Sequence, residues 1–249
     1  MKEDYSHTDW LPQPNRLDLH SHQVDVWRIK LDHPSATVKL LATILSEDEI
    51  QRAGSFHFPE DRDRYTIAHG SLRNILARYL KCKPEELNFG INDYGKPTIK
   101  VHQLEFNLSH SGDYALIAVT RDHKVGIDVE LIRSDMEVES MANRFFSPTE
   151  TAELMALPSE QRKLAFFNCW TRKEAFIKAQ GLGLSLPLAS FDVSLTPSEP
   201  AILRATRPDA HGASCWSLFS LEVDPKYASA LAVEEQEINL RLWDWNAFI

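Results

Sequence analysis

Two short segments hold the acidic and basic residues that could carry chemistry in this chain. One reads GIDVE at positions 126–130, and the other reads WTRKEAFIK at positions 170–178. Together they supply three carboxylates and two lysines, namely Asp128, Glu130, Glu174, Lys173 and Lys178. Three carboxylates suit a hard divalent cation, and lysines suit the phosphates that such a cation usually accompanies.

Regular secondary structure would bring the side chains of each segment onto one face. Asp128 and Glu130 alternate with apolar residues, so on a strand both acids point the same way. On a helix, a spacing of four forms a single stripe from Trp170, Glu174 and Lys178, with Lys173 beside it.

Each segment alone has an ordinary structural interpretation. A strand with alternating acids is typical of a sheet with one solvated face. A glutamate followed four residues later by a lysine is typical of an exposed ion pair that contributes about 0.3 kcal/mol to its helix. The chemical hypothesis therefore depends on the two segments together and on further motifs upstream.

Composition limits the class of protein. The chain has 249 residues, of which 43% are hydrophobic and 25% charged, as in a soluble globular protein. We expect no membrane span, because no apolar run reaches about 18 residues, and the start of the chain does not resemble a secretory signal. Three cysteines without metal-ligand spacing fit a reducing cytoplasm. A net charge of −9 argues against general nucleic-acid binding.

The first half of the chain shows clear helix and strand boundaries. Residues 1–17 are predicted to be a polar lead-in, followed by a strand over 24–29. Ser46 and Glu49 form a capping-box pattern, and Pro59 begins a helix that extends to about Leu80. A turn at 92–97 then precedes strands at 98–101, 115–120 and 125–131, the last two joined by a connection of hairpin length.

The second half repeats this order. Helices are predicted from Pro148 and over 160–180, the second ending at Gly181. Strands follow at 191–195, 215–223, 227–233 and 240–245. We therefore predict an α+β fold of two lobes, at 18–122 and 123–249, with a ligand cleft between them.

Five motifs in order support a more specific interpretation. They are YGKP at 94–97, FNLSHS at 106–111, GIDVE at 126–130, RFFS at 144–147 and the WTRKEAFIK segment. The chain resembles the 4′-phosphopantetheinyl transferases, specifically the larger surfactin-synthetase-activating (Sfp-like) type, over roughly residues 46–187. This resemblance implies two pseudo-symmetric α+β lobes in a monomer with coenzyme A between them.

The resemblance also implies the reaction and the roles of residues. A serine hydroxyl of an apo acyl carrier protein or peptidyl carrier domain attacks the β-phosphate of coenzyme A, and adenosine 3′,5′-bisphosphate leaves. Asp128, Glu130 and Glu174 would hold Mg²⁺ or Mn²⁺, which both accept oxygen ligands. Glu174 would also accept the serine proton, and Lys178, assisted by Lys173, would reach the diphosphate.

The 3′-phosphate of coenzyme A needs a separate cationic pocket, which the resemblance places at Arg64, Lys96, Ser109 and His110, with Pro97 completing the turn motif. Glu49 is acidic where some relatives carry a base, and only Arg52 nearby is positive. We therefore expect this pocket to depend more on Arg62 or Arg64. Tyr65 replaces a small hydroxyl residue, and each cation also has an ordinary surface interpretation.

Two further groups of residues have weaker interpretations. His20 and His22 could face a metal together, but no third ligand accompanies them in sequence, so we interpret them as partly exposed histidines. An acidic carrier protein would need a local docking patch between Ser134 and Lys163, and the candidates are Arg144, Arg162, Lys163, Met136, Met141 and Phe146.

Two other functions use the same residues. A metal-dependent phosphohydrolase would need the same carboxylates with water as the nucleophile. A noncatalytic module that binds coenzyme A or carrier proteins would keep the fold without the chemistry. The pathway served by the carrier proteins is open at this point.

Overall fold

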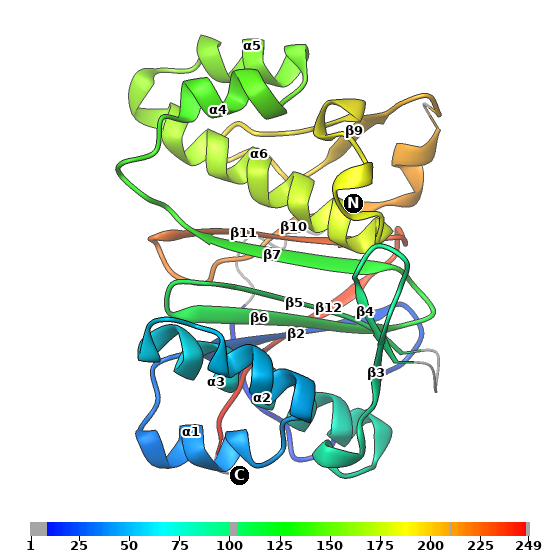
Figure 1. Ribbon diagram of the computed structural model, residues 1–249. Helices are drawn as coiled ribbons and strands as arrows, with labels where there is room; N and C mark the ends of the chain where they lie inside the picture. The colour runs from blue at the N-terminus through cyan, green and yellow to red at the C-terminus, as the bar shows by residue number, and fades with distance from the viewer. Residues whose placement is uncertain (1–8, 100–103, 210, 248–249) are drawn as a thin grey trace.

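Two β-sheets face each other in the interior, and the long helices lie outside them (Figure 1). The computed structural model describes residues 9–99, 104–209 and 211–247. The five-stranded sheet has the order β1 (Leu11–Pro12), β12 (Asn239–Asp244), β2 (Gln23–Lys30), β6 (Tyr114–Arg121) and β5 (Leu104–Ser111). The three-stranded sheet has the order β10 (Ser217–Ser220), β11 (Tyr227–Val233) and β7 (Val125–Leu131).

The two lobes repeat one arrangement, as predicted. The antiparallel order β5–β6–β2 in the first lobe matches β10–β11–β7 in the second. Helix α3 (Pro59–Leu80) belongs to the first lobe and α6 (Ser159–Gln180) to the second, and both have 22 residues. The mixed fold with two pseudo-symmetric lobes is therefore confirmed.

Smaller elements surround this framework. The helices are α1 (Ser35–Ala42), α2 (Glu47–Gly54), α4 (Val138–Phe145) and α5 (Pro148–Ala156). Two short hairpins consist of β3 (Phe89–Ile91) with β4 (Pro97–Ile99) and β8 (Phe191–Val193) with β9 (Leu203–Thr206). Single 3-10 turns occur at Pro84–Glu86, Gly183–Ser185, Leu188–Ser190 and Gly212–Cys215. In the predicted strand at 98–101, positions 100 and 101 lie outside the described residues.

The connections between the lobes differ from the prediction. β7 does not form a hairpin with β6 but pairs with β11, with Val125 opposite Val233. Residues 122–124 therefore carry the chain from one sheet to the other. The chain returns after β11, because β12 pairs in parallel with β2, and β1 within the predicted lead-in pairs with β12. The last strand within the predicted second lobe, at 123–249, therefore pairs in the sheet of the first.

Helix ends follow the local sequence closely. The Ser46 side chain accepts a hydrogen bond from the Glu49 amide (3.3 Å), and Glu49 accepts one from the Ser46 amide (2.8 Å). Ser147 and Glu150 form the same capping box at the start of α5. Gly181, at φ 67°, ends α6 in the left-handed region that glycine tolerates. These three predicted boundaries are confirmed.

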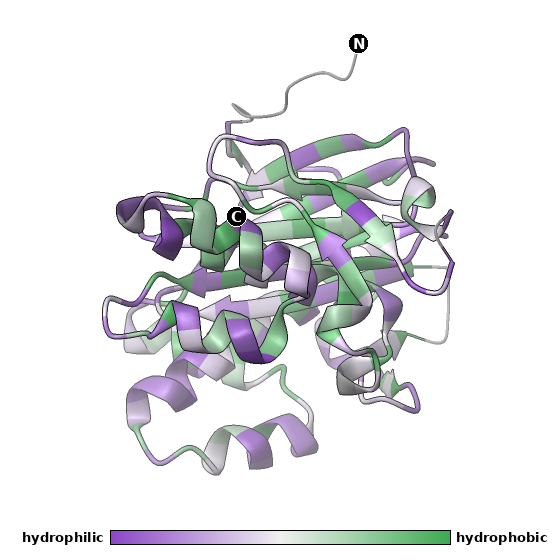
Figure 2. Cartoon of the chain, turned by 90° about the horizontal axis from the view of Figure 1, so that it is seen from above, coloured by the Kyte–Doolittle hydropathy of each residue, from purple (hydrophilic) through white to green (hydrophobic). Residues whose placement is uncertain are grey.

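A shared apolar core fills the space between the sheets. Val24, Val26, Leu116 and Ala118 from the first sheet pack with β7 and β11 residues of the second, including Val125, Ile127, Val129 and Leu231. Separate clusters lie beneath α3 and α6. In Figure 2 the outer helices alternate hydrophilic and hydrophobic segments, the pattern of helices with one buried face. Because the valines and Ile127 of β7 face the inter-sheet core, its residues 126, 128 and 130 face the opposite way.

Gly126 allows α6 to lie directly on β7. A Cβ atom at this position would lie 2.1 Å from the Ala175 carbonyl oxygen and 2.3 Å from the Ala179 amide nitrogen, both backbone atoms of α6. Side-chain motion cannot relieve such contacts. We therefore expect Gly126→Ala to destabilise the fold by about 3 kcal/mol, measured by urea unfolding. Gly54→Ala is the matched control, because nothing lies within 4 Å of its Cβ position. Equal stability of the two variants would contradict this close approach.

Candidate active site

Three elements meet at Asp128, in the centre of β7. The Lys178 ammonium on α6 donates hydrogen bonds to Asp128 Oδ1 (2.6 Å) and to Ser109 Oγ (2.9 Å). The Ser109 hydroxyl on β5 donates to the same Asp128 oxygen at 2.9 Å. Asp128 is buried, whereas the Lys178 side chain is 28% exposed. The lysine therefore lies at the boundary between this polar cluster and solvent.

One oxygen of Asp128 has no partner. Oδ2 is buried and accepts no hydrogen bond from any residue that the structure describes. An unsatisfied buried carboxylate oxygen is costly, so its retention calls for an explanation such as an ion. Asp128 Oδ2 is thus available as a ligand while Oδ1 is held by Lys178 and Ser109.

Glu130 and Glu174 belong to the same electrostatic neighbourhood. Burial raises the pKa of Glu130, and the charge of Asp128 raises it further. Burial likewise raises the pKa of Glu174, with Asp128 and then Glu130 adding to the effect and Lys178 opposing it. Three mutually repelling carboxylates of this kind would be relieved by a divalent cation. The three carboxylates therefore form a chemically suitable set of ligands for a divalent metal ion.

The three carboxylates do not close into a tight cage by themselves. Among the described residues, their oxygens are not gathered within 4.8 Å of one another. Mg²⁺ favours a few protein carboxylates together with water and phosphate oxygens, so a loose set of acids suits it.

Side chains of β5 join the two lobes at this point. Asn107 Oδ1 accepts a hydrogen bond from the Ile127 amide (2.8 Å), and Ser111 Oγ accepts one from the Leu131 amide (3.1 Å). Ser111 also donates to Glu130 Oε2 at 3.0 Å. β7 is an edge strand, and these alternate side chains satisfy amides that an edge leaves unpaired. The local sequence pattern predicts neither β5 nor the role of Asn107 and Ser111.

Lys173 does not reach this cluster, which corrects the prediction that it assists at the diphosphate. Its side chain is fully buried and its ammonium lies 2.8 Å from Glu150 Oε2. It also donates to the carbonyl oxygens of Leu188 and Phe191, each at 2.7 Å. Lys173 therefore ties α6 to α5 and β8. Trp170, at the head of the stripe, is the core anchor expected, packed edge-on against Phe145.

Arg64 and His110 meet in a small pocket of about 120 Å³, lined also by Phe56, Asp61 and Gly112. The Arg64 guanidinium contacts Asp113 Oδ1 at 2.7 Å. Partial desolvation lowers the pKa of His110, and the charges of His69 and Lys178 lower it further. His110 therefore lies within electrostatic reach of Lys178.

Lys96 lies elsewhere. Its ammonium donates to the carbonyl oxygens of Val125 (3.0 Å) and Ala179 (3.3 Å), and burial lowers its pKa. Asn92 in the same turn donates to the Gly181 carbonyl at 2.8 Å. The turn that precedes Pro97 therefore holds the end of α6. Lys96 does not line the pocket of Arg64 and His110, so the structure does not bring it together with them as predicted.

The other two candidate arginines, Arg52 and Arg62, are exposed and do not line that pocket. Arg52 lies over the Phe56 ring at 5.4 Å, and Arg62 lies 3.5 Å from Asp63. Glu49 has a structural role: burial raises its pKa, but hydrogen bonds from His69, the Ser46 amide and Arg73 outweigh this and bring the pKa to about 2. Of the predicted candidates, Arg64 is the one that faces the pocket with His110.

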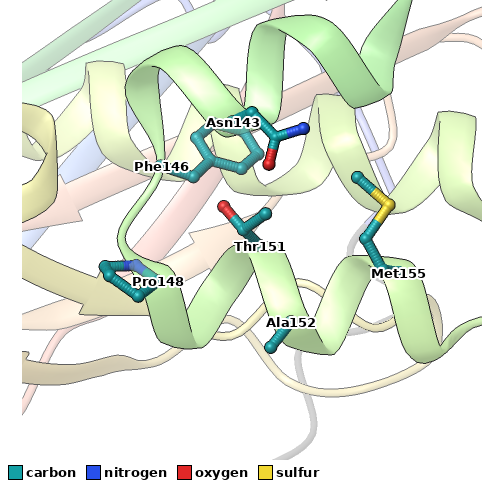
Figure 3. Close-up of a pocket in the computed structure, with 6 residues that line it drawn as sticks. All are labelled: Asn143, Phe146, Pro148, Thr151, Ala152 and Met155. Carbon is teal, nitrogen blue, oxygen red and sulfur yellow. The ribbon is translucent and has the colours of Figure 1, made fainter.

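A larger hollow of about 420 Å³ lies between α4 and α5 (Figure 3). Its lining consists of Asn143, Phe146, Pro148, Thr151, Ala152 and Met155, none of which titrates. This hollow offers no catalytic groups.

Within the described residues, no helix is both long and apolar enough to cross a membrane.

Comparisons with known proteins identify the family of the chain. The sequence profile of the 4′-phosphopantetheinyl transferase superfamily matches residues 124–232, and that of the 4′-phosphopantetheinyl transferase N-terminal region matches residues 32–122. The chain is 43% identical to the 4′-phosphopantetheinyl transferase HetI of Nostoc sp., over 90% of this chain and 93% of the relative. It is 31% identical to the 4′-phosphopantetheinyl transferase Sfp of Bacillus subtilis, over 83% and 90% respectively.

Proposed function

The chain belongs to the 4′-phosphopantetheinyl transferase superfamily, and we propose from this that it transfers the phosphopantetheine arm of coenzyme A to a serine of an apo acyl or peptidyl carrier protein. The serine oxygen forms a bond to the β-phosphorus, the bond to adenosine 3′,5′-bisphosphate breaks, and the serine proton passes to a base on the enzyme. The observation that carries this proposal is the Asp128–Lys178–Ser109 cluster with its unpartnered buried oxygen.

We assign a role to each charged residue of the site from its position. Glu174 accepts the serine proton, because it is a carboxylate that lies one helical turn from Lys178 on the same face of α6. Lys178 is partly exposed and can turn from Asp128 to the diphosphate. Asp128, Glu130 and Glu174 would hold Mg²⁺, or Mn²⁺, which when bound neutralises charge that develops on the diphosphate. All of these residues come from one chain, so we propose activity as a monomer.

The pocket of Arg64 and His110 is proposed to receive the 3′-phosphate of coenzyme A. Arg64 can exchange its exposed partner Asp113 for a phosphate, which guanidinium groups bind through paired hydrogen bonds. Ser109, next to His110 in sequence on β5, donates to Asp128, so one strand contributes a residue to the pocket and another to the Asp128 cluster. Arg52 and Arg62 are proposed only as surrounding positive charge.

Intact-mass analysis of apo carrier proteins tests the proposed function. After incubation with the protein, coenzyme A and Mg²⁺, we expect one phosphopantetheine group on the carrier serine. Free phosphopantetheine without carrier modification would instead indicate the phosphohydrolase. Binding of coenzyme A without either product would indicate a noncatalytic module.

Magnesium binding is expected to depend on pH in a defined direction. The raised pKa values of Glu130 and Glu174 mean that the folded state favours their protonated forms. Their contribution to stability is therefore present below about pH 4.5 and is lost as pH rises through the raised values. Mg²⁺ should restore it at neutral pH, raising Tm by about 5–10 °C at saturating concentration. This shift should shrink as pH falls and vanish near pH 4.5. A shift of equal size at every pH would contradict the assignment, and NaCl of matched ionic strength is the control.

Carrier docking is proposed on the surface around α4. Arg162 is already bound to Glu139 at 2.6 Å, Lys163 donates to the Ser134 carbonyl, and Phe146 is buried. Of the basic candidates, Arg144 is therefore the exposed one, and it lies over the Phe145 ring that packs on Trp170. The partly buried Met136 and Met141 lie close by in sequence.

Charge reversal at Arg144 tests this surface. We expect Arg144→Glu to raise the carrier KM by about tenfold, because rim charges steer an acidic partner, and to leave the coenzyme A KM unchanged. Lys39→Glu on α1, in the other lobe, is the matched control. An equal rise in both KM values would argue against docking at Arg144.

A further inference from the structure

His22, His123 and Glu235 come together outside the active site. His22 Nδ1 lies 3.2 Å from Glu235 Oε2, and His123 Nε2 lies 3.9 Å from the same oxygen. In the part of the chain that the structure describes, this is the only group of three histidine, cysteine or acidic residues whose ligand atoms all lie within 4.8 Å. Sequence reasoning paired His22 with His20, but His20 is not in the group.

The three residues lie where the chain passes between the sheets. His123 is in the crossing from β6 to β7, Glu235 is in the return from β11 to β12, and His22 immediately precedes β2. Backbone hydrogen bonds already hold these turns together: the Asn239 amide donates to the His22 carbonyl (2.8 Å), and the Glu234 amide donates to the Lys124 carbonyl (3.0 Å). Any ion bound here would therefore join both connections between the lobes.

The Glu235 carboxylate is oriented for binding. Its Oε1 accepts hydrogen bonds from the amides of Gln236 (2.6 Å) and Glu237 (3.3 Å), which leaves Oε2 facing the two imidazoles. Outer partners that fix a ligand in this way are typical of metal sites.

The donor set selects the class of ion. Two imidazole nitrogens and one carboxylate oxygen suit Zn²⁺, whereas Mg²⁺ prefers oxygen ligands throughout. Tetrahedral bonds of about 2.0–2.1 Å separate neighbouring ligand atoms by about 3.4 Å. The observed separations of 3.2 and 3.9 Å lie on either side of that value. The His22 side chain is 57% exposed, so a water molecule has access to a fourth position.

We propose that His22, His123 and Glu235 form a zinc site that joins the two chain crossings between the lobes. An ion pair between a protonated histidine and Glu235 would need only one imidazole. The site instead brings two imidazoles to one carboxylate oxygen, with ring centroids 5.7 Å apart. A single divalent ion satisfies both rings and the carboxylate at once.

Titration of the metal-free protein with Zn²⁺ tests the proposal, without coenzyme A or carrier protein, so the result is independent of the proposed transfer. All variants should carry Cys215→Ser, because this cysteine is free and exposed and could bind zinc itself. With excess Mg²⁺ added first to occupy the carboxylates around Asp128, we expect one Zn²⁺ per chain by calorimetry and a rise in Tm. His123→Asn and Glu235→Gln should each weaken binding by at least tenfold, since losing even an outer partner costs about 10–100-fold.

His20→Asn is the matched control, because His20 is exposed two residues from His22 but outside the group, and it should leave zinc affinity unchanged. Circular dichroism without zinc will show whether each variant folds. Equal zinc affinity of wild type, His123→Asn and Glu235→Gln would overturn the site, as would an absence of saturable binding in the wild type. The site would also be overturned if His20→Asn lost zinc binding while His123→Asn and Glu235→Gln kept it.

Discussion

Glu174→Gln is expected to lower the rate of phosphopantetheine transfer by about 10³-fold or more. Loss of a positioned general base alone costs about 10²–10⁴-fold, and this substitution also removes a proposed ligand of the metal. The fold should be unaffected or slightly stabilised at neutral pH, because burial and the charges of Asp128 and Glu130 make the ionised carboxylate unfavourable without a metal. Single-turnover assays on an apo carrier, followed by mass, measure the effect.

Two comparisons make this test specific. Glu160→Gln changes the same side chain at an exposed position of the same helix and should keep full activity. Urea unfolding of Glu174→Gln should give a midpoint no lower than that of the wild type. Wild-type-like transfer by Glu174→Gln would reject Glu174 as both base and ligand, whereas a loss of stability would assign it a structural role.

Lys173 and Lys178 lie five residues apart on α6, and their substitution by methionine should impair different properties. Lys173→Met should lower stability, and Lys178→Met should lower the rate of transfer. Lys173→Met leaves Glu150 charged in the interior, where the two side chains are 0% and 1% exposed. Removing one partner of a buried ion pair costs about 3–5 kcal/mol. The expected fall in Tm is about 6–20 °C for a chain of this size.

Lys178→Met should instead impair catalysis. Lys178 is partly exposed but its partner Asp128 is buried, so the loss of stability should be about 1–3 kcal/mol, less than for Lys173→Met. Transfer should fall by about 10²–10³-fold, the cost of removing one donor that stabilises developing charge. Urea unfolding of the two variants measures their stability, and assays with apo carrier protein measure their rate of transfer. If Lys173→Met unfolded like the wild type while losing transfer selectively, the separation of the two lysines would be wrong.

Most of the fold could be predicted because its elements have strong local patterns. The helices from Pro59 and Pro148 and the end at Gly181 follow from capping residues, which act within one turn. β5 was missed because Asn107, Ser109 and Ser111 make it look polar, although these side chains bond across to β7. The return of β12 to the first sheet is a long-range pairing that no local pattern records.

The candidate site likewise contains residues that local sequence patterns predict and residues that only long-range contacts place. Asp128, Glu174 and Lys178 could be found because strand and helix periodicity fixes the face on which each side chain lies. Lys173, one residue from Glu174, was misplaced because its partner Glu150 lies on another helix. His22 and Glu235 are separated by almost the whole chain, so only the fold brings them together.

Diffraction from crystals soaked with Mn²⁺ and coenzyme A tests the central claim most directly. Mn²⁺ accepts the same oxygen ligands as Mg²⁺ and can be located by its anomalous scattering. We predict one peak bounded by oxygens of Asp128, Glu130 and Glu174 and by the diphosphate, with Lys178 turned toward the phosphates. Coenzyme A bound between the lobes with no manganese at these carboxylates would contradict the proposed mechanism.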